Sequence, residues 1–204
     1  MGWSPGSNQE LIGREELVQK FDLKRVLKTG AVFGREKLEW MNAQYVRRLG
    51  VPALTDRLLP YLTKRGYSLG DRAWLERLVA LHHERIFTLG QFPDLAQFFF
   101  EDKIGYNEEA LSEFRKDPRL KKAFESYAAL LEGLGSFDVK TIEEKSRALM
   151  KDLGMTGKEF IHPCRVAVTG RSVSPGFFDT IALLGKKKAV ERLRSASEIL
   201  IGQV

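Results

Sequence analysis

The chain has a single cysteine, Cys164, so no disulfide can form within its 204 residues. A lone thiol is typical of proteins from a reducing compartment, and we expect a cytoplasmic protein. No apolar run approaches the ~20 residues that span a bilayer, because the triplet FFF at 98–100 is flanked by Gln97 and Glu101. The opening residues also lack the basic and apolar regions of a secretory signal peptide. We therefore expect no membrane partner.

Signatures of metal, phosphate and nucleophile chemistry are missing as well. The sequence has no HExxH, no CxxC pair, no GxxxxGK[ST] or GxGxxG phosphate loop and no GxSxG elbow. His82 and His83 are adjacent, so on a helix they project ~100° apart and cannot clamp one metal ion. Cys164 is expected to be a small apolar core residue. We expect no catalytic group, no metal and no cofactor in this chain.

What the chain does have is charge of both signs and helical periodicity. Its 33 basic and 27 acidic side chains leave a net charge of +6, which favours a phosphate-bearing partner without proving one. Apolar residues recur at helical spacing, as at Leu38, Met41, Tyr45 and Leu49, and no segment alternates convincingly like a strand. The pattern predicts an all-α chain with a joint near Gly50.

Capping residues indicate where the helices in the rest of the chain should begin and end. Acids, Ser or Thr before a helical run accept hydrogen bonds from its first N–H groups, and Gly after a run stops it. The expected starts are Asp71 for a helix over 71–87, Asp117-Pro118 for one to about Leu134, a capping box at Thr141 and Glu144, and Ser174-Pro175, with stops at Gly154 and Gly185.

The most informative segment is HPCRVAVTGRSVSPGFFDTIALLGK at 162–186. It predicts a short helix, a polar loop and a second helix, with Arg165 and Arg171 near the loop. Guanidinium groups beside free backbone N–H groups suit a polar, planar or anionic ligand such as RNA. No DNA partner is expected.

Three blocks of the sequence follow one another in a specific order. They are GWSPG at 2–6 followed by FDLKRVLKTGAVFGREKLEWMNAQYVRRL at 21–49, RIFTLGQF at 85–92 followed by FFF, and RVAVTGRSVSPGFFDTIALLGKKKAVERL at 165–193. In order and spacing they resemble the C-terminal half of bacterial-type glutamyl-tRNA synthetases. The ATP signatures that precede GWSPG in that family are absent.

This resemblance implies a non-catalytic part of a glutamate–tRNA ligase, a class I aminoacyl-tRNA synthetase. The full-length parent would use ATP and Mg²⁺, whereas this chain alone is expected to be inactive. Residues 1–49 would form a helical stem-contact region, and 50–97 and 98–204 would form two helical subdomains of an anticodon-binding cage. The expected partner is tRNA(Glu), bound by a monomer.

Arg85 stands where the family reads the third anticodon base, which is C in glutamate anticodons and G in glutamine anticodons. The pairing edge of C presents two acceptors to the donors of a guanidinium group, whereas that of G presents two donors and one acceptor. The resemblance therefore implies discrimination against tRNA(Gln). From the residues alone, the simpler interpretation is that Arg85 decorates a helix end, where the dipole favours a cation, and the resemblance reverses that preference.

Further positions match the family's anticodon contacts. Arg165 aligns with an arginine that contacts the first two anticodon bases, and Ser174, Pro175 and Phe177 align with the turn that forms a base pocket. Phe177 is expected either to stack on a base, at ~1–3 kcal/mol, or to pack in the core beside Phe178. Expected contacts to the tRNA backbone are Arg171, Lys186, Arg47, Arg48 and Lys37, and Trp40 is expected in the core.

Two other functions fit the sequence. One is a stand-alone helical module that binds RNA or a protein in trans. The other is the similar C-terminal domain of a class I lysyl-tRNA synthetase, against which the block around Arg85 argues.

Overall fold

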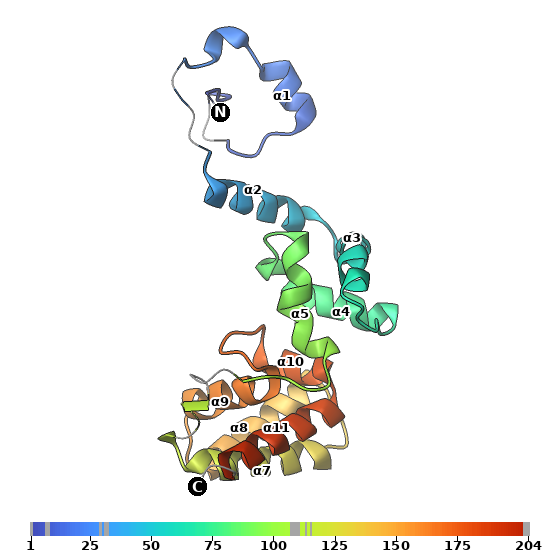
Figure 1. Cartoon of the computed structure of the whole chain (residues 1–204), viewed down its shortest axis with the longest axis vertical. Helices are drawn as coiled ribbons and strands as arrows, with labels where there is room; N and C mark the ends of the chain where they lie inside the picture. Colours follow the sequence, from blue (N-terminus) through green and yellow to red (C-terminus); the bar gives the residue numbers. More distant parts are fainter. Residues whose placement is uncertain are drawn as a thin grey trace.

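The computed structural model describes residues 2–6, 9–28, 30, 33–106, 111, 112, 114 and 116–201, with side chains up to residue 199. In these residues all regular structure is helical and no strand is present, which confirms the all-α prediction. The molecule is elongated, with the N-terminal segment at one end and a helical bundle at the other (Figure 1). None of the described helices is long and apolar enough to cross a membrane.

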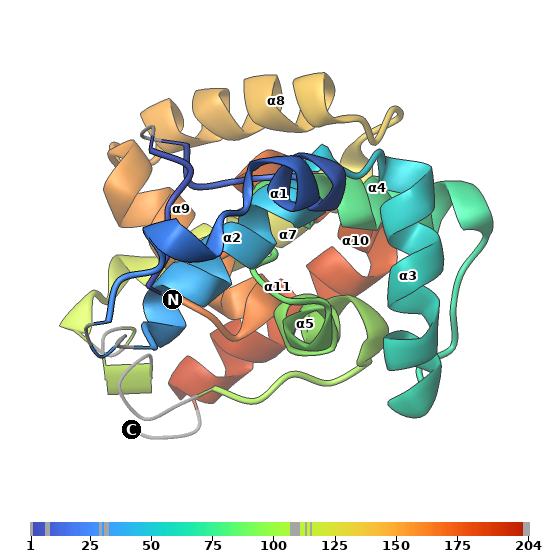
Figure 2. The ribbon, with the colours of Figure 1, turned by 90° about the horizontal axis from the view of Figure 1, so that it is seen from above.

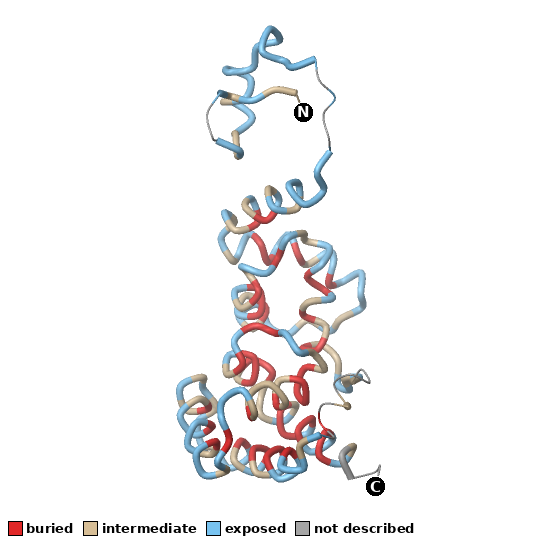
Figure 3. Tube along the Cα trace, turned by 90° about the vertical axis from the view of Figure 1, so that its left-hand side faces the viewer, coloured by how far each residue is buried: buried red, intermediate tan, exposed pale blue. Residues whose placement is uncertain are grey.

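The N-terminal region contains α1 (Arg14–Lys20), the 3₁₀ turn η1 (Leu23–Arg25) and α2 (Arg35–Arg48). Its burial is slight: α1 and η1 have no buried residue, and α2 has only two. Figure 3 shows the segment ahead of α2 as mostly exposed, with no buried residue. Trp40 is 41% exposed, so the prediction that it lies in the core is wrong. The reason is that α2 meets the rest of the chain through its C-terminal turns.

The middle of the molecule comprises α3 (Val51–Lys64), α4 (Arg72–His82), the 3₁₀ turns η2 (His83–Arg85) and η3 (Leu89–Gln91), and α5 (Phe92–Phe100). The cap at Asp71 is confirmed, because its carboxylate accepts from the Trp74 backbone N–H at 2.8 Å. The predicted helix over 71–87 is shorter, however. Ile86 is fully buried in an extended conformation, and this turns the chain before the next helical segment begins.

The C-terminal bundle comprises α7 (Arg119–Gly133), α8 (Val139–Asp152), α9 (Gly157–Thr169), α10 (Phe177–Leu184) and α11 (Lys186–Ile201). α11 packs along α7, and the core includes Phe124, Tyr127 and Phe160. Cys164 is fully buried, as predicted, and burial raises the pKa of its thiol. Seen along the long axis, α5 points at the viewer between α3 and the bundle (Figure 2).

The stops of two helices are confirmed, and two of the predicted starts are wrong. Gly154 and Gly185 follow α8 and α10 with φ of +63° and +89°, a conformation that favours glycine. Asp138, not Thr141, caps α8, because its carboxylate accepts from the Thr141 N–H at 2.9 Å inside the first turn. The predicted start at Ser174-Pro175 is wrong, because α10 begins at Phe177 with Gly176 at the cap position. The helix predicted from Asp117-Pro118 is α7, which begins at Arg119, the residue after Pro118.

A buried arginine fixes α5 to the bundle. Arg192 of α11 is 4% exposed, and its guanidinium donates to the carbonyl oxygens of Val168, Phe98 and Glu101 at 2.6, 2.7 and 2.6 Å. Carbonyls at a helix C-terminus have no intrahelical donor, so these bonds satisfy the ends of α5 and α9. The boundary predicted at residue 97 lies inside α5, which runs unbroken to Phe100.

Candidate nucleic-acid interface

A cavity of about 440 Å³ opens where α4 and α5 meet the loop between α9 and α10. One wall comes from residues 82–87 and 95–98, and the other from residues 171–175, so segments some 80 residues apart in sequence close around it. Its size is within the ~300–1,000 Å³ range of small-ligand sites. The residues that line it are His82, Glu84, Arg85, Phe87, Leu95, Phe98, Arg171, Val173, Ser174 and Pro175.

Arg85 is the last residue of η2 and is exposed. Its guanidinium makes no hydrogen bond or ion pair with any residue that the structure describes. The carboxylate of the neighbouring Glu84 is held instead by Arg47 of α2, with Nε and Oε2 3.0 Å apart. The donors of Arg85 are therefore available to a ligand in the cavity.

Arg165 approaches the same place from α9. It is half-buried, and its Nη1 makes a long hydrogen bond of 3.4 Å to the carbonyl oxygen of Ser174. Burial, and then repulsion from the charge of Arg85, lower the pKa of Arg165. The two guanidinium groups are thus close enough to repel each other, and a ligand rich in acceptors would relieve that repulsion.

Arg171 lies in the cavity wall on a turn with little freedom. Its backbone N–H donates to Thr169 Oγ1 at 3.1 Å, and that hydroxyl donates to the Arg165 carbonyl at 2.8 Å. Gly170 has a φ of +71°, and a Cβ there would stand 2.5 Å from the Gly105 carbonyl oxygen, so glycine is required. The Arg171 side chain donates to Gln97 Oε1 at 3.3 Å and lies 5.9 Å from the centre of the Phe98 ring.

The aligned turn supplies two of its three expected residues. Ser174 and Pro175 line the cavity, although the Ser174 hydroxyl donates to the Pro175 carbonyl at 3.1 Å. Phe177 is only 4% exposed, and its ring packs against Tyr127 and Phe178 at centroid distances of 6.2 and 5.3 Å. Of the two roles expected for Phe177, the structure shows core packing beside Phe178, which covers the ring that would stack on a base.

Comparison with known proteins identifies a family whose model matches the part of the chain that forms this cavity. The family model described as the anticodon binding domain matches residues 53–197, which include both walls of the cavity. This chain belongs to the anticodon-binding-domain family. The match contains Arg85, Arg165 and the whole 171–175 loop.

Several relatives of this anticodon-binding domain are named glutamate–tRNA ligase. The chain is 36% identical over 203 residues to the glutamate–tRNA ligase of Symbiobacterium thermophilum, covering 95% of this chain and 41% of that protein. It is 34% identical over 200 residues to the glutamate–tRNA ligase of Bacillus subtilis, covering 96% and 41%. A crystal structure of a glutamate tRNA ligase from Elizabethkingia meningosepticum in complex with its amino acid matches with a TM-score of 0.86 and 25% identity, covering 97% of this chain and 39% of that one. The chain thus spans about two fifths of the length of the relatives it matches.

The other basic residues predicted to touch RNA do not line the cavity of this anticodon-binding domain. Lys186 donates to the Glu132 carbonyl at 3.2 Å and to that of Leu134, so its ammonium group caps the C-terminus of α7. Arg47 is paired with Glu84, and the Lys37 ammonium lies 2.7 Å from a Glu10 carboxylate oxygen. The exposed Arg48 lies 5.6 Å from the centre of the Tyr45 ring. Contact of these residues with the tRNA backbone stays a prediction, and Lys186 has an observed structural role at the end of α7.

Sequence reasoning missed two groups in the cavity. Phe87 is 44% exposed and offers an aromatic face two residues after Arg85, which its position in a predicted helix concealed. His82 is buried, and its ring Nδ1 is 2.9 Å from the Leu78 carbonyl oxygen. Burial lowers the pKa of His82 to about 4, so the ring is neutral at pH 7 and Nδ1–H donates. Among the described residues, no group of three or more His, Cys, Asp or Glu side chains could hold a metal ion.

Proposed function

We propose that this chain binds the anticodon loop of tRNA(Glu) as the recognition part of a glutamate–tRNA ligase. The observation that supports this most lies within the matched anticodon-binding domain: Arg85 and Arg171 line one cavity, and Arg165 donates to the carbonyl of Ser174 in the wall of that cavity. Three cations with few acidic partners favour an acceptor-rich ligand, and Phe87 adds a face on which a base can stack. The relatives named above are glutamate–tRNA ligases, which favours this function over a lysyl-tRNA synthetase.

We further propose that Arg85 reads the third anticodon base. Its unpaired guanidinium offers only donors, which match the O2 and N3 acceptors of C and oppose the N–H donors of G. A bidentate contact between a side chain and a base edge discriminates by ~1–3 kcal/mol against the wrong base. The domain would therefore prefer tRNA(Glu) to tRNA(Gln).

The remaining chemistry belongs to the whole ligase. Such an enzyme would activate glutamate with ATP and Mg²⁺ and esterify the 3′ end of its tRNA. We expect that this chain, a cytoplasmic monomer in our proposal, catalyses no ATP–pyrophosphate exchange, because it carries none of the ATP signatures. Detectable exchange above a buffer blank would contradict that.

The direct test is binding of an RNA hairpin with the tRNA(Glu) anticodon stem and loop, measured by fluorescence anisotropy at several salt concentrations. We expect saturable binding whose log K falls linearly with log salt, and no comparable affinity for a DNA hairpin of the same sequence. Arg57→Gln, on an exposed face of α3 away from the cavity, is the matched control for Arg85→Gln. Equal affinity for hairpins with C and with G at the third anticodon position would refute the proposed reading.

A further inference from the structure

Two side chains of α2 contact the turn that carries Arg85. Arg47 forms an ion pair with the Glu84 carboxylate, and its Nη2 also donates to the Glu84 backbone carbonyl at 3.1 Å. The Asn42 side-chain amide donates to the backbone carbonyl of Phe87. The contacts therefore reach the residue before Arg85 and the second residue after it.

The backbone between these two contacts has little freedom. Ile86, which follows Arg85, is fully buried. A ring nitrogen of His83 lies 3.4 Å from the Val46 carbonyl oxygen of α2. The Arg85 guanidinium, in contrast, makes no hydrogen bond or ion pair within the described part of the chain. The place of this guanidinium group therefore depends on where the backbone of the turn lies.

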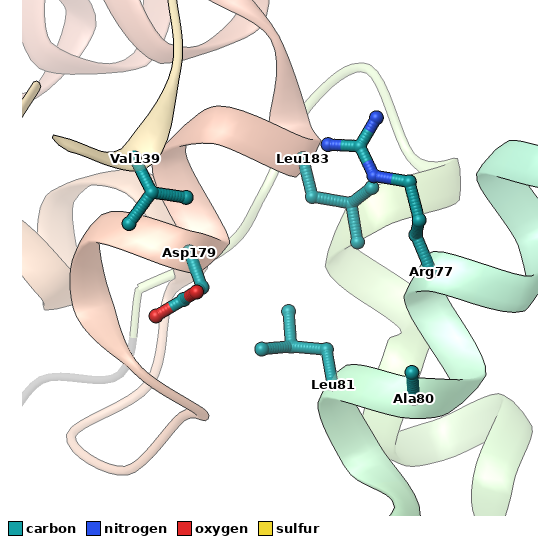
Figure 4. A pocket seen from close by; sticks show the side chains of 6 residues that line it. All are labelled: Arg77, Ala80, Leu81, Val139, Asp179 and Leu183. Atoms are coloured by element: carbon teal, nitrogen blue, oxygen red, sulfur yellow. The ribbon is translucent and has the colours of Figure 1, made fainter. Parts of the chain in front are cut away.

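The bundle supports the beginning of α4 more closely than its end. Near the first turn of α4, the Trp74 indole N–H donates to the Leu183 carbonyl of α10 at 3.1 Å. Along its later turns a cavity of about 470 Å³ separates the two helices (Figure 4). The residues that line this cavity are Arg77, Ala80, Leu81, Val139, Asp179 and Leu183. The turn that follows α4 therefore depends more on α2 for support than the first turn of α4 does.

The contacts from α2 matter more for placement than for stability. The Glu84 side chain is 78% exposed, and solvent screens an ion pair with such a partner, so the pair adds little to the stability of the fold. Placement has a strict tolerance, because a binding group must be held within ~0.5 Å of its productive position. Two parallel hydrogen bonds to O2 and N3 of a cytosine need that accuracy.

We propose that Arg47 and Asn42 are positioning residues for the base that Arg85 reads. They place the guanidinium group by holding the backbone on either side of it, and they do not touch the base. This inference rests on the proposed function, because it takes Arg85 to read the third anticodon base. It gives Arg47 a role different from the contact to the tRNA backbone that the resemblance implies.

The test measures the affinity of the 204-residue chain for two anticodon hairpins, with C or with G at the third anticodon position. We expect Arg47→Met and Asn42→Leu each to lower the ratio of the two affinities about threefold, near the lower end of the coupling between residues of one hydrogen-bond network. Arg85→Gln should lower the ratio further, because it removes the donors themselves. The ratio does not depend on the fraction of folded chain, since a loss of folded chain weakens both apparent affinities equally.

The matched control is Arg35→Met. Arg35 lies in the first turn of the same helix and also forms an exposed ion pair, with Glu39 at 3.0 Å, but both partners belong to α2. Its loss should leave the ratio unchanged.

A double variant separates positioning from a contact between Arg47 and a phosphate. If Arg47 bound a phosphate, Arg47→Met would weaken both hairpins equally and reduce the slope of log K against log salt by about one. That result with an unchanged ratio would overturn the inference for Arg47. Glu84→Met removes no cation, yet it should lower the ratio in the unaltered chain and leave it unchanged in Arg47→Met, because the two side chains form one contact. An equal effect of Glu84→Met in both backgrounds would also overturn it.

The outcomes separate this inference from the function on which it rests. An unchanged ratio in Arg47→Met or Asn42→Leu, together with a lowered ratio in Arg85→Gln, would overturn the positioning role of that residue and leave the proposed function intact. If the unaltered chain binds neither hairpin, or binds both equally well, the proposed reading by Arg85 and this inference fail together.

Discussion

Replacing Arg192 with methionine should destabilise the chain far more than replacing the nearby Arg194. Methionine keeps the apolar stem of Arg192 but removes every donor, which leaves the carbonyls of Val168, Phe98 and Glu101 without the guanidinium bonds that the structure shows. A buried acceptor that loses its partner costs ~1–3 kcal/mol, and hydrogen bonds to charged groups lie in the upper part of that range. Two facts reduce the sum: Lys188 also donates to Glu101, and burial penalises the Arg192 charge and lowers its pKa. We expect a net loss of about 2–4 kcal/mol.

The assay is urea unfolding of Arg192→Met and Arg194→Met, followed by circular dichroism. Arg194 is half-exposed and pairs with Glu132 at 2.6 Å. Its loss should cost no more than ~1 kcal/mol, because solvent screens exposed ion pairs. If Arg192→Met unfolds at the same urea concentration as Arg194→Met, the reasoning about the buried carbonyls is refuted.

Three further predictions concern the cavity and the caps. Arg85→Gln should weaken binding of the C-containing anticodon hairpin by ~1–3 kcal/mol and reduce the preference over G, as anisotropy titrations with both hairpins would show; an undiminished preference would defeat the assignment. Phe87→Ala should weaken hairpin binding by ~1–3 kcal/mol with little change in stability, whereas Phe177→Ala should cost ~3–5 kcal/mol of stability, because its ring is buried; the reverse result would exchange the two roles. Glu159 has its pKa lowered from 4.5 to about 2, first by a hydrogen bond from Arg119. A lowered folded-state pKa contributes stability above pH 4.5 that is lost as the pH falls toward 2, so the difference in thermal midpoint between the unaltered chain and Glu159→Gln should shrink over that interval; a constant difference would contradict it.

Local signals in the sequence predicted those parts of the fold that local chemistry determines. Helical periodicity established the fold class, and the caps and stops at Asp71, Gly154 and Gly185 depend only on nearby backbone groups. The capping box predicted at Thr141 is wrong, because Asp138 supplies the acceptor three residues earlier and the two capping patterns overlap in sequence. Spacing alone cannot rank two competing caps.

The candidate site was predictable only in part, because it depends on contacts between distant segments. The family resemblance led to Arg85, Ser174 and Pro175, which line one cavity in the structure, though their contact with RNA stays a prediction. The choice between Phe177 and Phe178 for the core depends on where Tyr127 lies, 50 residues earlier. Lys186 likewise meets carbonyls at the end of α7 that no local pattern reveals.

The ion pair between Arg47 and Glu84 links α2 to the middle of this elongated molecule. Arg47 holds the Glu84 carboxylate and donates to its backbone carbonyl at 3.1 Å, and the next peptide unit carries Arg85. A second contact joins α2 to the same segment, because the Asn42 side-chain amide donates to the Phe87 carbonyl. The segment that carries Arg85 is therefore held on both sides by α2, so a tilt of that helix would also move Arg85. If the chain binds RNA as proposed, a ligand that contacts both α2 and Arg85 must match the fixed distance between them, and affinity would then depend on the length of the target as well as on the identity of a base.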